Sequence, residues 1–148
     1  MNKHQSVNIV MIEDDEGHAR LIEKNIRRAG ILNDITHFTD GTSAIEYLFN
    51  SPDGPALNGP ALVLLDLNLP DMSGTDILAK VKADPVLKRT PVVVLTTTDD
   101  KVEIQRCYDL GCNVYITKPV EYESFASAIR QLGLFLSVIQ VPAVEPDS

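Results

Sequence analysis

Five short apolar segments alternate with longer amphipathic ones, and this alternation restricts the fold more than any other feature of the chain. The apolar segments are Val7–Ile12, Ile35–Phe38, Leu62–Leu67, Val92–Thr96 and Asn113–Thr117. Three of them are nearly continuous in Val, Ile and Leu, which is typical of parallel strands covered on both faces. The other segments predict helices at Ala19–Ala29, Thr42–Phe49, Asp76–Val81, Lys101–Leu110 and Tyr122–Ser137. A strand followed by a helix, five times over, predicts a doubly wound α/β sheet.

Local signals refine this pattern. In the first predicted helix, Leu21, Ile22 and Ile26 fall on one stripe, and Gly30 is a natural C-terminal cap. The segment Ser51–Pro60 is rich in Pro and Gly and predicts a surface loop before the third strand. The 148 residues fit a single domain. We expect its core at about residues 7–133, followed by an apolar C-terminal extension at 134–148.

Composition and charge exclude several classes of protein. The net charge of -8 argues against a general nucleic-acid binder. No apolar run approaches the ~20 residues of a membrane helix, and the N-terminus lacks the features of a signal peptide, so we expect a cytoplasmic protein. Cys107 and Cys112 match neither a CxxC motif nor a zinc pattern, so we expect two reduced, partly buried thiols.

Chemically active side chains follow four of the predicted strands. Glu13 and Asp14 follow the first, Asp66 ends the third, Thr96 ends the fourth, and Lys118 follows the fifth. Because functional residues of open α/β sheets gather at the carboxyl ends of the strands, these groups are expected to converge. Each signal is weak alone, since strand-end acids and threonines usually cap helices and most lysines are solvated. Their joint order is the informative observation.

The convergence predicts a particular chemistry. Carboxylates at close range cannot all stay ionised without help, and Mg²⁺, which favours oxygen ligands, supplies that help. A divalent cation and the Lys118 ammonium around one carboxylate form a receptor for a phosphoryl group. Asp66 would then be the nucleophile, and Thr96 would donate a hydrogen bond to a phosphoryl oxygen.

These motifs resemble the receiver domain of two-component response regulators over about Val7 to Gly133. The matching stretches are MIEDD, LLDLNLPDMSG, VVVLTT and VYITKP, in that order. The resemblance implies a flavodoxin-like (βα)5 fold with strand order 2-1-3-4-5. It also implies that Asp66 is the phosphoacceptor, with a metal site made of Glu13, Asp14, Asp66 and the backbone carbonyl of Asn68 for Mg²⁺ or Mn²⁺.

The resemblance assigns further roles. Lys118 matches the phosphate-binding lysine, Thr96 the switch hydroxyl and Tyr115 the aromatic residue whose rotamer follows the switch. Asn68 and Thr98 occupy the two positions that tune phosphoryl lifetime, and both are uncharged here. The Lys118–Pro119 bond matches one that is cis in the family, and Pro70 and Gly74 fit the turn after the acceptor.

Some features depart from the common family pattern. Thr97 stands where alanine is frequent and narrows access to the site. The loop between Asp14 and Arg20 is one residue longer than in many receivers, and a Pro/Gly insert precedes the third strand. Together with the apolar tail, these features are similar to stand-alone receivers paired with bacterial and cyanobacterial phytochrome histidine kinases.

The implied function is a single-domain phosphorylation switch that catalyses only its own phosphorylation and dephosphorylation. Its implied partners are a sensor histidine kinase and a downstream phosphotransfer protein or target. Homodimerisation is expected either through the face of Lys101–Leu110, Asn113–Thr117 and Tyr122–Ser137 or through the tail.

Two alternatives from other classes stay open on the sequence. A small phosphatase with an aspartyl-phosphate intermediate would want an acid two residues after the nucleophile, where Asn68 stands. A flavodoxin-like cofactor binder would want a phosphate-cradling glycine cluster, and the eight glycines form none. The histidines His4, His18 and His37 show no ligand spacing. His18 lies near the acidic loop, so two interpretations are open for it: a residue that senses the site, or a solvated residue at the start of a helix, which is favoured.

Overall fold

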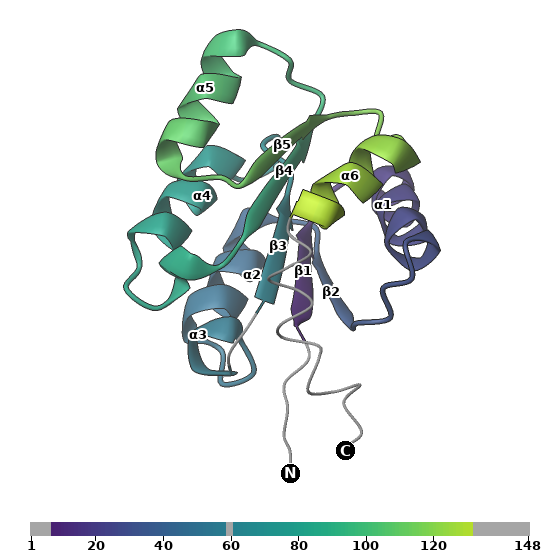
Figure 1. Ribbon diagram of the computed structural model, residues 1–148. Coiled ribbons are helices and arrows are strands. Elements are labelled where there is room, and N and C mark those ends of the chain that lie inside the picture. Colours follow the sequence, from purple (N-terminus) through teal and green to yellow (C-terminus); the bar gives the residue numbers. More distant parts are fainter. Residues whose placement is uncertain (1–6, 59–60, 132–148) are drawn as a thin grey trace.

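The computed structural model describes residues 7–58 and 61–131 and forms three layers, a central sheet with helices on both faces (Figure 1). Within these residues the sheet has five parallel strands in the order β2-β1-β3-β4-β5. The strands are β1 (Asn8–Ile12), β2 (Ile35–Phe38), β3 (Ala61–Leu65), β4 (Val92–Thr96) and β5 (Val114–Thr117). The predicted strand order and fold class are therefore confirmed.

Helices cover the sheet from both sides. The α-helices are α1 (Glu16–Arg28), α2 (Gly41–Ile45), α3 (Pro55–Asn58), α4 (Gly74–Ala83), α5 (Lys101–Leu110) and α6 (Tyr122–Gln131). A π-helical turn, η1 (Glu46–Asn50), continues α2, and a 3₁₀ turn, η2 (Leu87–Arg89), follows α4. In Figure 1, α1 and α6 lie together on one side of the sheet and α2, α4 and α5 on the other.

The alternation of side chains along each strand builds two apolar clusters. Ile9 and Met11 of β1 pack with Ile22 and Ile26 of α1 and Phe125 of α6. The intervening residues of β1, Val10 and Ile12, pack on the opposite face with residues of α2, α4 and α5. Burying one such side chain contributes about 1.5–3 kcal/mol, so burial on both faces explains why the strands are apolar without interruption.

Helix α1 begins three residues earlier than predicted. The Asp15 carboxylate accepts a hydrogen bond from the His18 backbone N–H (2.9 Å) and so caps the helix. The predicted stripe is wrong at Leu21, which is 39% exposed, whereas Ile22 and Ile26 are buried. Gly30 follows the capping residue Ala29 with a positive φ of 86°, which fits its predicted role at the helix end.

The structure also corrects the predictions for one loop and for the two cysteines. The loop predicted at Ser51–Pro60 contains the short helix α3, so that prediction is wrong in part. Cys107 and Cys112 are free, as expected, and both are buried, at 0% and 6% exposed, rather than partly buried. Burial raises the pKa of Cys112 to about 12. The C-terminal extension and the end of the predicted last helix lie outside the described residues. Among the described helices, none combines the length and apolar character needed to cross a membrane.

Candidate phosphoacceptor and metal site

The carboxyl edge of the sheet brings together the side chains that the sequence places at strand ends. Glu13 follows β1 and Lys118 follows β5, while Thr96 is the last residue of β4. Asp66 lies one residue beyond β3, and its backbone N–H donates to the Ile12 carbonyl (3.0 Å), which continues the ladder. Neighbouring parallel strands thus carry these groups to one place, as predicted.

Lys118 is held by two buried acids. Its ammonium donates to Glu13 Oε1 at 2.6 Å and to Asp66 Oδ2 at 3.1 Å. The three side chains are between 1% and 6% exposed. Buried charges are tolerated only when they are paired and hydrogen-bonded. The ion pairs therefore explain why Asp66 can end an apolar strand.

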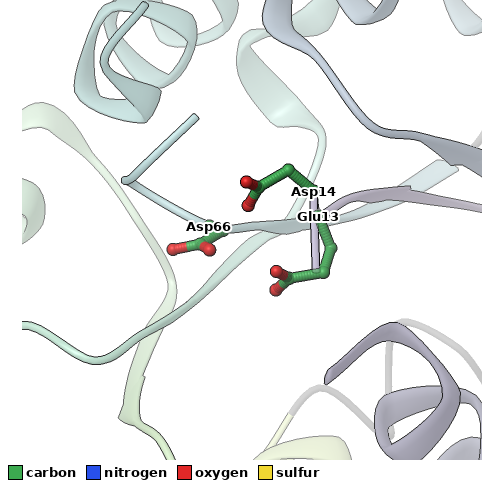
Figure 2. Close-up of side chains that lie close together, drawn as sticks. All are labelled: Glu13, Asp14 and Asp66. Carbon is green, nitrogen blue, oxygen red and sulfur yellow. The ribbon is translucent and has the colours of Figure 1, made fainter. Parts of the chain in front are cut away.

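The acids outnumber the lysine. Glu13, Asp14 and Asp66 each offer a carboxylate oxygen, and these oxygens lie within 4.8 Å of one another. Figure 2 shows the three carboxylates gathered around a common space. Three carboxylates and one ammonium leave two negative charges uncompensated. Burial, followed by the charge of Asp66, raises the pKa of Glu13, while the hydrogen bonds from Lys118 and the Asp15 backbone oppose this shift.

The donor set fits a hard divalent cation. All three groups are oxygen donors, and Asp14 is exposed whereas Glu13 and Asp66 are buried. Mg²⁺ is typically held by one or two carboxylates and keeps several waters, which one exposed and two buried acids allow. A cation bound by Glu13, Asp14 and Asp66 would neutralise the excess negative charge of the cluster.

The loop after Asp66 is folded tightly. The Asn68 backbone N–H donates to Asp66 Oδ1 (3.2 Å), and Asn68 pairs with Ser73 in a single antiparallel bridge. The Gly74 N–H donates to the Leu67 carbonyl (2.8 Å). A Cβ at Gly74 would lie 2.3 Å from the Asp66 carbonyl oxygen, so only glycine fits. This turn therefore fixes the backbone directly after Asp66.

A series of hydrogen bonds connects Asp66 to Tyr115. Asn68 Nδ2 donates to Thr96 Oγ1 (3.2 Å), which also accepts from the Thr98 N–H (3.5 Å). The Thr98 carbonyl in turn accepts from the Tyr115 hydroxyl (2.7 Å). Burial raises the pKa of Tyr115 to about 12, so the hydroxyl remains a donor. The residues expected to form the switch are therefore connected to Asp66 through Asn68.

Comparison with known proteins identifies the family of this chain. A family model described as the response regulator receiver domain matches residues 9–130. The chain belongs to this family. The Lys118–Pro119 bond of this chain is cis, as the resemblance implied.

Several relatives match this chain over most of their length. The response regulator receiver domain from Rhodospirillum rubrum is 70% identical with a TM-score of 0.76, over 92% of this chain and 97% of that one. Response regulator Rcp1 from Synechocystis sp. is 32% identical over 91% of this chain and 92% of its own length. The bacteriophytochrome response regulator RtBRR is 34% identical with a TM-score of 0.76, over 87% of this chain and 79% of that one. The similarity therefore extends over most of the length of each of these relatives.

The structure brings His18 into the site, against the favoured interpretation of the sequence. Its Nδ1 lies 3.0 Å from Lys118 Nζ, and its side chain is 45% exposed. The sequence held no signal for this contact, because Lys118 is a hundred residues away along the chain. Thr97 is exposed and lines a cavity of about 220 Å³ together with His18, Leu21, Lys118, Pro119 and Val120.

Asp71, which no sequence pattern singled out, connects the loop after Asp66 to the start of α2 through hydrogen bonds. Its carboxylate accepts from the Thr42 hydroxyl and from the backbone N–H groups of Gly41 and Thr42 (both 2.8 Å). These hydrogen bonds, the Thr42 hydroxyl first, lower the pKa of Asp71 to about 2. An acid after a proline carries no pattern that points to a helix start thirty residues earlier.

Proposed function

We propose that this receiver domain accepts a phosphoryl group on Asp66 from the phosphohistidine of a sensor histidine kinase. The observation that carries the proposal is the position of the Asp66 carboxylate, directly after the central strand β3. One of its oxygens accepts from Lys118, and two other carboxylates lie within 4.8 Å. In the transfer, an Asp66 oxygen attacks phosphorus, the P–N bond to the donor imidazole breaks, and the imidazole leaves with the bonding electrons. An aspartyl phosphate remains and is later hydrolysed by water.

The residues of this chain divide the work. Lys118 places a fixed positive charge beside Asp66 and offsets negative charge on the phosphoryl oxygens. Glu13, Asp14 and Asp66, with the backbone carbonyl of Asn68, would hold the divalent cation. When bound, Mg²⁺ or Mn²⁺ supplies further charge neutralisation to the phosphoryl group, and a structure of the related Rcp1 holds Mn²⁺.

The hydrogen-bonded chain from Asn68 to Tyr115 supports a switch. A phosphoryl oxygen on Asp66 can accept the Thr96 hydroxyl proton, which would draw Thr96 Oγ1 toward Asp66 and away from the Thr98 N–H that donates to it. The contact between the Thr98 carbonyl and Tyr115 would then be lost, and Tyr115 would rotate. The altered surface comprises α5, β5 and α6. Asn68 and Thr98, next to the acceptor and the switch hydroxyl, would set the phosphoryl lifetime.

The partners follow from the relatives and from one cavity. Similarity to the bacteriophytochrome response regulator RtBRR supports a phytochrome-type kinase as the phosphoryl donor. The cavity of about 220 Å³ beside Lys118 is lined in part by the apolar side chains of Leu21, Pro119 and Val120. A phosphohistidine helix resting there would reach Asp66. We place this exchange in the cytoplasm and propose onward relay to a phosphotransfer protein or a protein target, without enzymatic turnover of an external substrate.

Homodimerisation remains a proposal with one structural argument. Val102 and Tyr108 of α5 are 75% and 45% exposed, and exposed apolar side chains are common at interfaces. Sedimentation of the full chain with and without acyl phosphate tests it. A monomer at all concentrations and in both states would contradict it.

Acid-sensitive labelling tests the central proposal. With Mg²⁺ and a small acyl phosphate donor, the wild-type chain should give a labelled species that D66N lacks. The matched control is D76N, an exposed acid at the start of α4, which should label like the wild type. Equal labelling of D66N and the wild type would overturn the assignment of Asp66.

The kinase proposal has a separate test. A phosphorylated phytochrome-type kinase should lose its label to this chain much faster than a phosphorylated kinase of another sensor class. Equal rates from both kinases would contradict a phytochrome pathway while leaving the role of Asp66 intact.

A further inference from the structure

Lys118 has three protons to donate, and the structure gives each an acceptor. Glu13 Oε1 lies at 2.6 Å, His18 Nδ1 at 3.0 Å and Asp66 Oδ2 at 3.1 Å from Nζ. The ammonium group has three N–H donors and no acceptor, so these three contacts satisfy it. The Lys118 side chain is 4% exposed, which leaves little room for water to replace any of the three.

The contact fixes the state of the imidazole. Because lysine only donates, the Nδ1 atom of His18 must be the acceptor, and the ring proton must lie on Nε2. His18 is the third residue of α1, and its backbone N–H is bonded to the Asp15 cap (2.9 Å). The helix start therefore holds the ring at the edge of the site.

His18 differs from the other two acceptors because it takes up neither a cation nor a phosphoryl group. Glu13 belongs to the acidic cluster that fits a cation, and Asp66 is the proposed phosphoacceptor. When Glu13 binds a cation or Asp66 takes up a phosphoryl group, its hydrogen bond with Lys118 becomes weaker. His18 is not one of the three acids of that cluster, although its Nδ1 lies 3.8 Å from Glu13 Oε2. Its hydrogen bond to Lys118 can therefore persist throughout.

We propose that His18 is a positioning residue, which holds the Lys118 ammonium toward Asp66 through its Nδ1 atom. This inference rests on the proposed phosphorylation of Asp66 and adds a residue to it. Without His18, one Lys118 proton loses its acceptor, and the ammonium shifts toward Glu13, its nearest partner. The expected consequence is slower phosphoryl transfer, with little change in how the donor binds.

Two variants of similar shape separate the acceptor from the bulk of the ring. In His18→Asn the amide oxygen stands at the same number of bonds from Cβ as Nδ1, whereas His18→Leu has the same branching and no acceptor. With acetyl phosphate and Mg²⁺, we expect His18→Leu to lower the maximal rate of labelling about tenfold, the loss expected for a hydrogen bond to a charged group. The donor concentration at half-maximal rate should stay within about twofold.

His18→Asn should restore most of the rate. The control Lys24→Leu, which changes an exposed side chain of the same helix, should leave it unchanged. A wild-type rate in His18→Leu would overturn the proposal. So would a failure of His18→Asn to restore the rate while its thermal midpoint matches that of the wild type, since the ring would then act by its shape.

A second measurement needs neither metal nor phosphoryl donor. Nitrogen-15 NMR of the metal-free wild type at alkaline pH should show His18 with its proton on Nε2 and an acceptor-type Nδ1. Removal of the donor in Lys118→Met should give a mixture of tautomers. A wild-type ring with its proton on Nδ1 would overturn the positioning role. Absence of labelling in the wild type would instead overturn the proposed function, so the two failures are distinct.

Discussion

Two lysines at opposite edges of the sheet show how the same side chain serves two purposes. At the amino edge, Lys82 donates to the carbonyl oxygens of Lys88 (3.3 Å) and Thr90 (2.7 Å) and to the side-chain oxygen of Asn113 (3.3 Å). At the carboxyl edge, Lys118 donates to two carboxylates and an imidazole. Each ammonium has three acceptors; those of Lys82 are all neutral, whereas two of the three around Lys118 are carboxylates.

The difference decides what each edge does. The neutral acceptors of Lys82 tie together the loops that lead into β4 and β5, and burial lowers the pKa of its ammonium. At the carboxyl edge the acids exceed the lysine in number, so a cation and a phosphoryl group find a charged, partly desolvated site. The amino edge therefore stabilises the fold, whereas the carboxyl edge has an excess of negative charge that can bind a cation.

The largest contrast is expected from removing each lysine. Lys118→Met leaves the Glu13 and Asp66 carboxylates buried without the ammonium group that pairs with them. The free energy of unfolding, measured without Mg²⁺, should therefore fall by about 3 kcal/mol. Labelling should fall about a hundredfold or more, as when one donor to a developing charge is lost. Lys82→Met should cost about 1 kcal/mol and leave the labelling rate unchanged. Urea unfolding and labelling measure both, and an equal loss of labelling in the two variants would erase the contrast.

Two glycines extend the comparison to the backbone. In Gly74→Ala the new Cβ meets the Asp66 carbonyl oxygen at 2.3 Å, so the turn after the acceptor must shift. We expect a loss of about 2 kcal/mol together with slower labelling. Gly111, which ends α5 beside Lys82, has a φ of 109°.

Replacing Gly111 by alanine should strain the backbone, because its φ is positive. We expect Gly111→Ala to lower the free energy of unfolding by about 1 kcal/mol and to leave the labelling rate unchanged. Thermal unfolding and labelling of both variants test this prediction. Normal labelling in a destabilised Gly74→Ala would show that the turn does not position Asp66.

Only the carboxyl edge should respond to divalent cations. Because Mg²⁺ binds the native state, at ten times its Kd it should stabilise the wild type by about 1.4 kcal/mol. Asp14→Asn removes one ligand and should abolish most of this gain, whereas the exposed Asp53→Asn should keep it. Calorimetric midpoints with and without Mg²⁺ provide the readout. Full stabilisation of Asp14→Asn would place the cation elsewhere.

The smallest effect concerns Asp71 and acid. Its pKa is lowered from 3.8 to about 2 in the folded chain, so its contribution to stability is present above pH 4 and lost as the pH falls toward 2. Asp71→Asn should therefore be less stable than the wild type at neutral pH, and the difference should vanish in acid. Thermal midpoints across this range measure it, and a difference independent of pH would contradict the assigned hydrogen bonds.

The fold was predictable because its signals are local. Continuous apolar runs gave the strands, and β2 and β4 match the predicted ranges residue for residue. Helix starts were less predictable, since the Asp15 cap acts through a backbone hydrogen bond three residues ahead. Leu21 fits the apolar period of α1 but borders the carboxyl edge, where the sheet no longer covers it. The helix at Pro55–Asn58 is too short to show a period.

The residues of the site also fall into a group that was predictable from the sequence and a group that was not. Glu13, Asp14, Asp66, Thr96 and Lys118 were predictable because parallel strands carry their ends to one edge. His18 and Asp71 were not, because their partners are set by tertiary distance alone: Lys118 for the first and Gly41 with Thr42 for the second. Both residues belong to loops or helix starts beside the strand ends, where a side chain can turn in several directions.

The position of the phosphoryl group is the most direct test of the contrast between the two edges. After reaction with acetyl phosphate and Mg²⁺, borohydride reduction converts a phosphorylated aspartate to homoserine, and peptide mass spectrometry locates it. The proposal predicts homoserine at position 66 and at no other aspartate. Homoserine at position 14, or a phosphoryl group on His18 in place of Asp66, would contradict it.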